Sequence, residues 1–253
     1  MHPRPSRIGD SPGRRSRMNR PTSVKHRLRT RRADVHLTLM LVLTFSTGVI
    51  DAVGYLALDR VFTANMTGNV VILGMALTGA DGLPVAGPAL ALVGFVAGAA
   101  IAGRAVRGEC AGWSRRSTAV FGATAAVLAA VAIVAGAMGT PPEPVALAVT
   151  TSLGIAMGMQ AGTARHLAVK DVTTVVVTST LAGLAADSWL GGRASAHPWR
   201  RRVGAVVLIC AGASVGAATL HVGFWLGVTV SAVLTIAVTI AGHLTIGEED
   251  DHG

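Results

Sequence analysis

Asp51 is the residue whose type and position most directly predict chemistry. It is a carboxylate inside a long apolar segment that begins near residue 37. If that segment crosses a bilayer, the carboxylate costs roughly 2.5–3.5 kcal/mol there, and such residues commonly mark proton or ion pathways. The nearest basic residue in the sequence is Arg60, about two and a half helical turns further on. Two interpretations stay open: Asp51 carries a proton or a cation, or it is protonated or hydrogen-bonded and fixes helix packing against a Thr or Asn side chain.

A second polar feature follows at residues 62–69, which read FTANMTGN. Asn65 and Asn69 are four residues apart, as are Thr63 and Thr67, so each pair would share one face of a helix. The glycine before Asn69 would equally permit unwound backbone. Unpaired amides are costly in hydrocarbon, so these side chains must face protein or a wet cavity. They either line a solute path or form interhelical hydrogen bonds worth ~0.6–2 kcal/mol each.

The composition indicates the elements that hold these residues. Of the 253 residues, 51% are hydrophobic and 14% charged, with a mean hydropathy of +0.55, whereas soluble domains are about 25% charged. Apolar runs near 20 residues, separated by Gly, Pro and Arg clusters, predict a polytopic helical membrane protein. The expected segments are about 37–58, 60–80, 85–106, 117–139, 145–168, 171–191, 203–220 and 222–244.

Charge divides the chain into three parts. Residues 1–36 hold eleven Lys and Arg against two Asp, which accounts for the whole net charge of +9. This composition predicts a disordered cytoplasmic tail, and it lacks the aromatic and folded elements typical of nucleic-acid binding. A transmembrane domain at 37–246 and a short acidic tail at 247–253 follow. The two cysteines, Cys110 and Cys210, predict neither a disulfide framework nor a metal site.

Basic loops determine the expected topology. Eight plain crossings from a cytoplasmic N-terminus would place the arginine-rich 104–116 loop outside, against the positive-inside rule. The conflict disappears if 60–80 and 171–191 are re-entrant or discontinuous. Six crossings then remain, and both termini are cytoplasmic. Glycines at four-residue spacing, Gly94/Gly98 and Gly154/Gly158, predict close helix contacts.

An internal repeat supports this topology. Shifting the chain by 111 positions aligns Tyr55–Asn69 with His166–Thr180 at five identities, and it superimposes the four segments of residues 37–139 on those of 145–246. Three crossings per half make the halves inverted, which is a transporter and channel architecture. The repeat also brings Gln160 to the level of Val49, two positions from Asp51, and makes Thr174 and Thr178 the mates of Thr63 and Thr67.

The motifs GVIDAVGYLAL and VFTANMTGN, with GMQ and a TT…T segment in the second half, resemble the YoaK family of bacterial membrane proteins, or domain of unknown function 1275. The resemblance covers about residues 37–244. It implies about six spanning helices in a bacterial inner (plasma) membrane, and it implies no established activity. Ser179 and Ala161 stand where the family commonly has Gly and Asn. The matching positions are Gly48, Asp51, Phe62, Asn65, Thr67, Gly68 and Asn69, and more loosely Gln160, Thr173, Thr174 and Thr178.

We therefore expect an all-α multi-pass membrane protein that acts as a small-solute transporter or channel. A non-transporting scaffold or accessory subunit is the alternative. No nucleophile–base or acid–base pair and no nucleotide or metal motif is apparent, so we expect neither an enzyme nor a cofactor. The expected partners are the lipid bilayer and an unidentified small solute, and a homo-oligomer stays open. The candidate substrate-path residues are Asp51, Thr63, Asn65, Thr67, Asn69, Gln160, Thr174 and Thr178.

Overall fold

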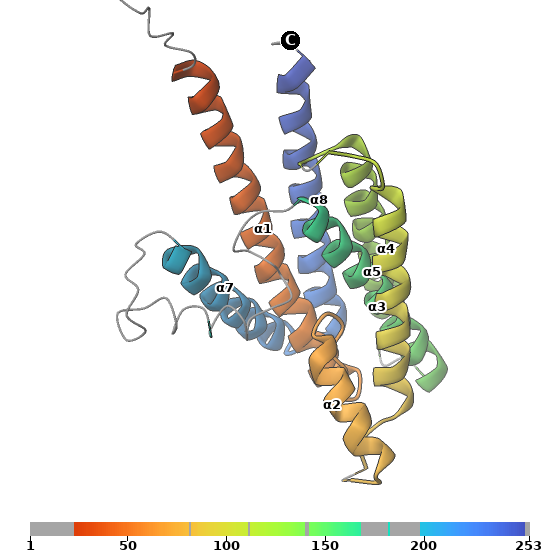
Figure 1. Ribbon diagram of the computed structural model, residues 1–253. Helices are drawn as coiled ribbons and strands as arrows, with labels where there is room; N and C mark the ends of the chain where they lie inside the picture. The colour runs from red at the N-terminus through yellow and green to blue at the C-terminus, as the bar shows by residue number, and fades with distance from the viewer. Residues whose placement is uncertain are drawn as a thin grey trace, which may run out of the picture.

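The computed structural model describes residues 23–80, 82–110, 112–139, 142–167, 182 and 198–250. In these residues the regular secondary structure is entirely helical, as the apolar segments predict (Figure 1). The helices are α1 (Ser23–Ala57), α2 (Met66–Leu77), α3 (Ala86–Ala105), α4 (Arg115–Met138), α5 (Glu143–Leu167), α7 (Pro198–Thr219) and α8 (Phe224–Asp250).

Six of these helices are long and apolar enough to cross a membrane, which confirms the expected number of spanning segments. Their candidate spans are Asp34–Ala57, Ala86–Ala105, Arg115–Met138, Glu143–Leu167, Arg201–Thr219 and Phe224–Ile246. The seventh, α2, has 12 residues and therefore covers about 18 Å, short of a ~30 Å hydrocarbon layer. The expected segment 171–191 lies outside the described residues apart from residue 182, as do Thr174 and Thr178.

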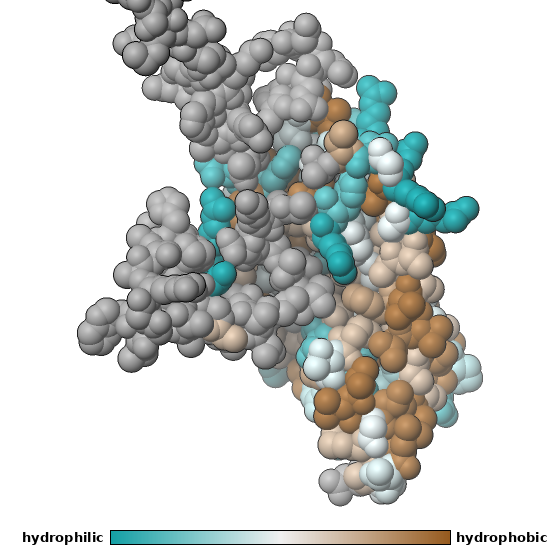
Figure 2. Space-filling view, in the orientation of Figure 1, coloured by the Kyte–Doolittle hydropathy of each residue, from teal (hydrophilic) through white to brown (hydrophobic). Residues whose placement is uncertain are grey.

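The helices pack in three close pairs: α3 along α5, α1 along α7, and α4 along α8. The start of α1, the end of α8 and the connection between α3 and α4 lie at one end of the bundle, and α2 lies at the other (Figure 1). Figure 2 shows hydrophilic side chains gathered near the first end, and mainly apolar side chains over the rest of the visible coloured face. The described chain therefore has a polar end and an apolar flank, as a membrane bundle requires.

The predicted glycine contacts are confirmed in the α3–α5 pair. A Cβ atom on Gly98 would collide with the backbone oxygen of Ile155, and one on Gly158 with that of Phe95. Gly94 and Gly154 also lie close to the backbone of the opposite helix, at somewhat larger separations. Without side chains between them the two helix backbones touch, which is how membrane helices gain packing energy.

The core behind Asp51 is apolar. Val49, Ile50 and Val53 of α1 are fully buried and pack in one cluster with residues of α4, α5 and α8. The side chains on either side of Asp51 along α1 are thus fixed in the bundle, which holds the carboxylate in place.

Candidate functional site

α1 ends at Ala57, within two turns of Asp51. The Leu58 N–H still donates to the Gly54 carbonyl (2.9 Å), and the Arg60 N–H reaches back to the Tyr55 carbonyl (3.1 Å). Asp59 and Arg60 have φ angles of 53° and 61°, the left-handed region that costs non-glycine residues roughly 1–2 kcal/mol each. The chain then turns back along α1 and stays non-helical until α2 begins at Met66.

Asp51 holds this non-helical segment through one carboxylate oxygen. Its Oδ1 accepts hydrogen bonds from three successive backbone N–H groups, those of Thr63 (2.9 Å), Ala64 (2.7 Å) and Asn65 (3.4 Å). The Thr63 hydroxyl adds a fourth donor at 3.3 Å. Consecutive N–H groups that point at one place form an anion site, because their dipoles add. The Asp51 carboxylate therefore occupies the anion site that the backbone forms in the break between α1 and α2.

The other carboxylate oxygen of Asp51, Oδ2, accepts no hydrogen bond from the described part of the chain. Its residue is only half-buried. An ionised carboxylate offers about four acceptor positions, so Oδ2 keeps its capacity to bind a cation, a proton or a donor group.

Asn69 fixes the same segment from the other side. Its Oδ1 accepts from the Phe62 N–H (2.9 Å), and its Nδ2 donates to the Phe62 carbonyl (2.6 Å). Both backbone groups of Phe62 are thereby paired by one side chain that is only 1% exposed. The Phe62 ring stacks on Tyr55 at 4.8 Å and lies over Gly68, where a Cβ atom would sit 2.7 Å from it.

Asn65 and the two threonines have separate roles. Asn65 is the N-cap of α2, and its Oδ1 accepts from the Gly68 N–H (3.3 Å), a bond typical of helix starts. Thr63 is fully buried against Asp51. Thr67 is exposed on α2 and makes no hydrogen bond through its side chain within the described chain. Asp51, Thr63, Asn65 and Asn69 thus form one cluster, and Thr67 lies outside it.

Gln160 lies on α5 and contacts α1 one turn before Asp51. Its Nε2 donates to Thr47 Oγ1 (3.1 Å), while that hydroxyl donates to the Leu43 carbonyl (2.9 Å). The Thr47 hydroxyl donates its only proton to Leu43, so it can only accept a hydrogen bond from Gln160. This requirement fixes the orientation of the Gln160 carboxamide. Gln160 Oε1 is then buried with no hydrogen-bond partner among the described residues. Gln160 is thus an interhelical contact that retains one free acceptor.

Comparison with known proteins identifies the family. The family described as "Protein of unknown function (DUF1275)" matches residues 39–241, which is most of the chain. The chain belongs to the DUF1275 family. It is also 29% identical over 221 residues to the UPF0700 transmembrane protein YoaK of Bacillus subtilis (strain 168), covering 84% of this chain and 96% of that protein. No solved structure matches the chain. The family membership and the six apolar helices together identify a multi-pass membrane protein.

Three residues of this site were not among the candidate residues chosen from the sequence. Thr47 stands four residues before Asp51, so the shared helix face was a usable signal. Phe62 and Ala64 take part through backbone groups, which their side chains do not reveal. No group of three or more His, Cys, Asp or Glu residues that could hold a metal ion occurs in the described residues.

Proposed function

We propose that this DUF1275 protein is a small-solute transporter or channel whose polar site is the break between α1 and α2. The observation that carries the proposal is the unwound segment next to Asp51. One carboxylate oxygen is bound to its backbone, and the other receives no donor from the residues that the structure describes. Irregular backbone at membrane depth is tolerated only where protein buries it or where it lines a cavity. In transporters, discontinuous helices of this kind supply the substrate and ion sites.

The course of the chain supports a discontinuous form for the segment predicted at 60–80. α2 continues beyond the end of α1, away from the end where α1 starts and α8 finishes (Figure 1). α1 and α2 would together make one interrupted crossing, with Asp51 near the interruption. Six crossings result, and both termini and the arginine-rich 104–116 loop then lie on one side. By the positive-inside rule that side is the cytoplasm of a bacterial cell.

Two pairs of glycine contacts support the inverted repeat. Gly48 of α1 faces the backbone of Ile209 and Ala213 on α7. In the same way, Gly158 of α5 faces the backbone of Phe95 and Ala99 on α3. A second equivalent pair follows: Gly212 of α7 faces the backbone of Phe45 on α1, and Gly98 of α3 faces the backbone of Ile155 on α5. Gly48 and Gly158 lie 110 positions apart and Gly98 and Gly212 lie 114 apart, close to the shift of 111 found in the sequence. Exchanging the halves therefore converts one close helix pair into the other.

The chemistry of the site favours a small polar solute or a cation. Asp51 Oδ2 supplies a negative acceptor, and Gln160 Oε1 supplies a neutral one a turn away on the partner half. Both groups accept and neither donates, so the favoured solute carries N–H or O–H donors or a positive charge. In a coupled carrier, Asp51 would bind the proton or cation. The proposal assigns the protein no catalytic role and no cofactor.

The scaffold alternative also has an observation in its favour. Asn65 and Asn69 form hydrogen bonds only within the break itself, which is what a purely structural motif requires. A transporter and a scaffold place different requirements on Asp51, because a scaffold does not need the negative charge of its carboxylate. The substitution Asp51→Asn tests this difference, since it keeps an acceptor oxygen for the three backbone N–H groups and removes the charge.

The functional experiment has two steps. Purified protein in detergent is screened with metabolites and cations for compounds that raise its melting temperature, and the uptake of each such compound is measured in proteoliposomes. Asp51→Asn should abolish uptake with little change in melting temperature, while the matched exposed change Asp59→Asn should retain uptake. Uptake that survives Asp51→Asn would rule out the site. A screen without any stabilising compound, together with normal folding of Asp51→Asn, would favour the scaffold.

Topology is tested with thiol labelling of intact cells. Thr78→Cys, at the exposed end of α2, is placed in a background with both native cysteines changed to Ser. The control retains native Cys110, which is exposed in the α3–α4 connection, as its sole cysteine. An impermeant reagent should label Thr78→Cys from outside and Cys110 only after permeabilisation. Labelling of both from the same side would contradict the six-crossing arrangement.

A further inference from the structure

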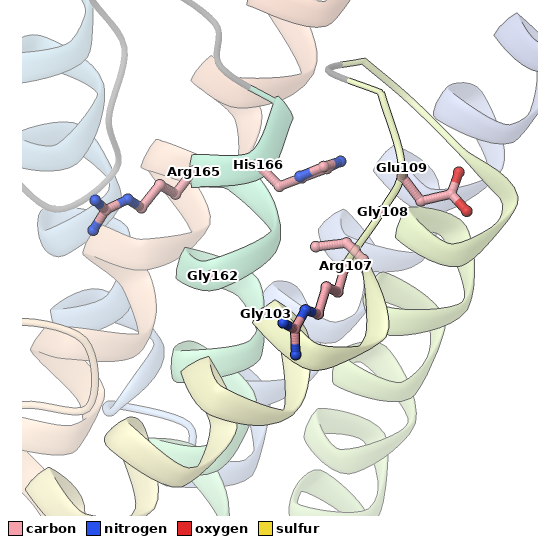
Figure 3. A pocket seen from close by; sticks show the side chains of 8 residues that line it. Gly103, Arg107, Gly108, Glu109, Gly162, Arg165 and His166 are labelled. Atoms are coloured by element: carbon pink, nitrogen blue, oxygen red, sulfur yellow. The ribbon is translucent and has the colours of Figure 1, made fainter.

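An open pocket of about 480 Å³ lies between the ends of α3 and α5, at the polar end of the bundle (Figure 3). Its lining includes one glycine from each helix, Gly103 and Gly162. A Cβ atom on Gly162 would lie 2.9 Å from the Ala102 side chain, whereas one on Gly103 would meet nothing within 4 Å. The helices are therefore in close contact at Gly162, and the space beside Gly103 is open.

The side chains around this pocket are mainly basic. Arg107, Arg165 and His166 line it together with one carboxylate, Glu109. Glu109 forms an ion pair with Arg116 at 3.0 Å, so its negative charge is compensated by an arginine outside the lining. Figure 3 shows the His166 ring directed toward the chain after α3, while the Arg165 side chain extends to the opposite side of α5. Arg107 and His166 thus flank the pocket, and Arg165 adds charge at its rim.

The C-terminal ends of α3 and α5 carry partial negative charge, which opposes the binding of an anion in the pocket. α3 and α5 both finish at the pocket, and each C-terminus contributes roughly −0.5 of a charge. Arg116 donates to the carbonyls of Ala105 (3.5 Å) and Arg107 (3.2 Å) and so pairs two of the exposed groups at the end of α3. Arg107 and Arg165 line the pocket, and Arg116 pairs with Glu109, so three arginines against one glutamate outweigh the two helix ends.

His166 provides an independent indication of a ligand. Its Nε2 is shielded from solvent and has no hydrogen-bond partner among the described residues. Polar atoms shielded in this way are normally paired, because leaving one unpaired costs on the order of 1–3 kcal/mol. An oxygen atom of an anion in the pocket would supply the missing partner once the imidazole ring turns toward the open space.

The pocket lies where a headgroup would be. It is formed by the final residues of two candidate spans, Ala86–Ala105 and Glu143–Leu167, and basic pockets between membrane helices at this depth suit lipid phosphates. We propose that the pocket binds the phosphate-bearing headgroup of an anionic phospholipid. Arg107 forms the charge-assisted hydrogen bond, His166 donates a second after its ring turns into the pocket, and Gly103 leaves room for the glycerol backbone. This site is independent of transport, since a non-transporting scaffold would bind the lipid equally.

The test measures lipid binding to the purified full-length protein. Delipidated protein in neutral detergent is titrated with phosphatidylglycerol and, separately, with zwitterionic phosphatidylcholine, and bound lipid is counted by native mass spectrometry. Phosphatidylglycerol should bind preferentially. Arg107→Gln should weaken its binding about tenfold, as the loss of one charge-assisted hydrogen bond predicts. Arg104→Gln removes the same charge at the end of α3 outside the pocket lining and should weaken binding less than twofold.

A second variant separates shape from charge. Gly103→Leu fills the open space without changing any charge, and it replaces an exposed helical glycine with a better helix former, so the melting temperature should not fall. It should weaken phosphatidylglycerol binding about as much as Arg107→Gln. Equal effects of Arg104→Gln and Arg107→Gln, or unchanged binding in Gly103→Leu, would overturn the proposal. Binding of inorganic phosphate that depends on Arg107, without binding of phosphatidylglycerol, would overturn the lipid assignment in favour of a free anion.

Discussion

The break between α1 and α2 and the contact between α3 and α5 are stabilised by different means. In the break, Asp51, Asn65 and Asn69 form hydrogen bonds with backbone groups of the non-helical segment and of the first turn of α2. In the α3–α5 contact, the closest approaches are between glycines such as Gly158 and the opposite backbone. Each intact helix pairs its own backbone groups, so that contact needs only close packing.

The difference shows how polar residues are distributed in this chain. The α1–α2 break leaves several backbone groups without helical partners, and the most polar side chains of the apolar region lie where those groups are. A polar residue in a span therefore need not be functional in itself. Oδ2 of Asp51 and Oε1 of Gln160 stand out because no hydrogen bond within the described part of the chain accounts for them.

The largest effect is expected in the glycine contact. Gly158→Leu would force a side chain against the Phe95 backbone, and because helix backbones cannot yield locally, we expect a loss above about 4 kcal/mol, which prevents folding. The control is Gly122→Leu on α4, where a Cβ atom would meet nothing within 4 Å. Yield of monodisperse protein on size exclusion is the measurement. A monodisperse Gly158→Leu protein with wild-type melting behaviour would refute the close contact.

The next effect is expected at Asp51. Asp51→Ala removes the acceptor of three backbone N–H groups, and leaving them unpaired should cost on the order of 3 kcal/mol. Asp51→Asn should cost much less, because an amide oxygen still accepts. Melting temperatures in the same detergent compare the two variants with wild type. Equal destabilisation by Asn and Ala would mean that the charge, rather than the hydrogen bonds, holds the break.

Part of this arrangement was predictable from the sequence. Apolar length predicts eight segments, and the positive-inside rule reduces the crossings to six. The need of the FTANMTGN side chains for hydrogen-bond partners is also predictable, because amides in an apolar region must be hydrogen-bonded. The pairing of Asp51 with the backbone of residues 63–65 was not predictable. It depends on a reversal at Asp59 and Arg60, where two successive residues are left-handed without a glycine. Asp tolerates this region, but Arg gives no such signal.

The interpretation of Asn65 and Asn69 as one helix face was correct only in part. They are four residues apart, yet Asn65 precedes α2 as its cap and Asn69 lies within the helix and reaches back to Phe62. Spacing alone cannot locate a helix start inside a polar motif, because a cap and a first-turn residue have the same spacing as two helical residues. The expected roles of Thr174 and Thr178 stay predictions, since both lie outside the described residues.

An intermediate effect is expected at Asn69. Asn69→Ala leaves the N–H and carbonyl of Phe62 without their partner, and two hydrogen bonds at ~0.6–1.7 kcal/mol each predict a loss of about 2 kcal/mol. Asn69→Asp keeps the acceptor for the Phe62 N–H and removes the donor to the Phe62 carbonyl. Its melting temperature should therefore also lie below that of wild type. Melting temperature is again the measurement. If Asn69→Ala melts like wild type, the amide does not hold Phe62, and a solute-binding role for Asn69 becomes the better interpretation.

The smallest effect is expected at the cap of α2. Asn65→Ala removes the acceptor for the Gly68 N–H and should cost about 1 kcal/mol, while Asn65→Asp retains an acceptor and should restore most of it. Thr67→Ala, in the exposed first turn of the same helix, is the matched control and should leave the melting temperature unchanged. The same three variants also sharpen the functional question. A compound that stabilises wild type and Asn65→Asp but not Thr67→Ala would place the solute path along the outer face of α2, since the Thr67 side chain makes no hydrogen bond with the described residues that its loss could disturb.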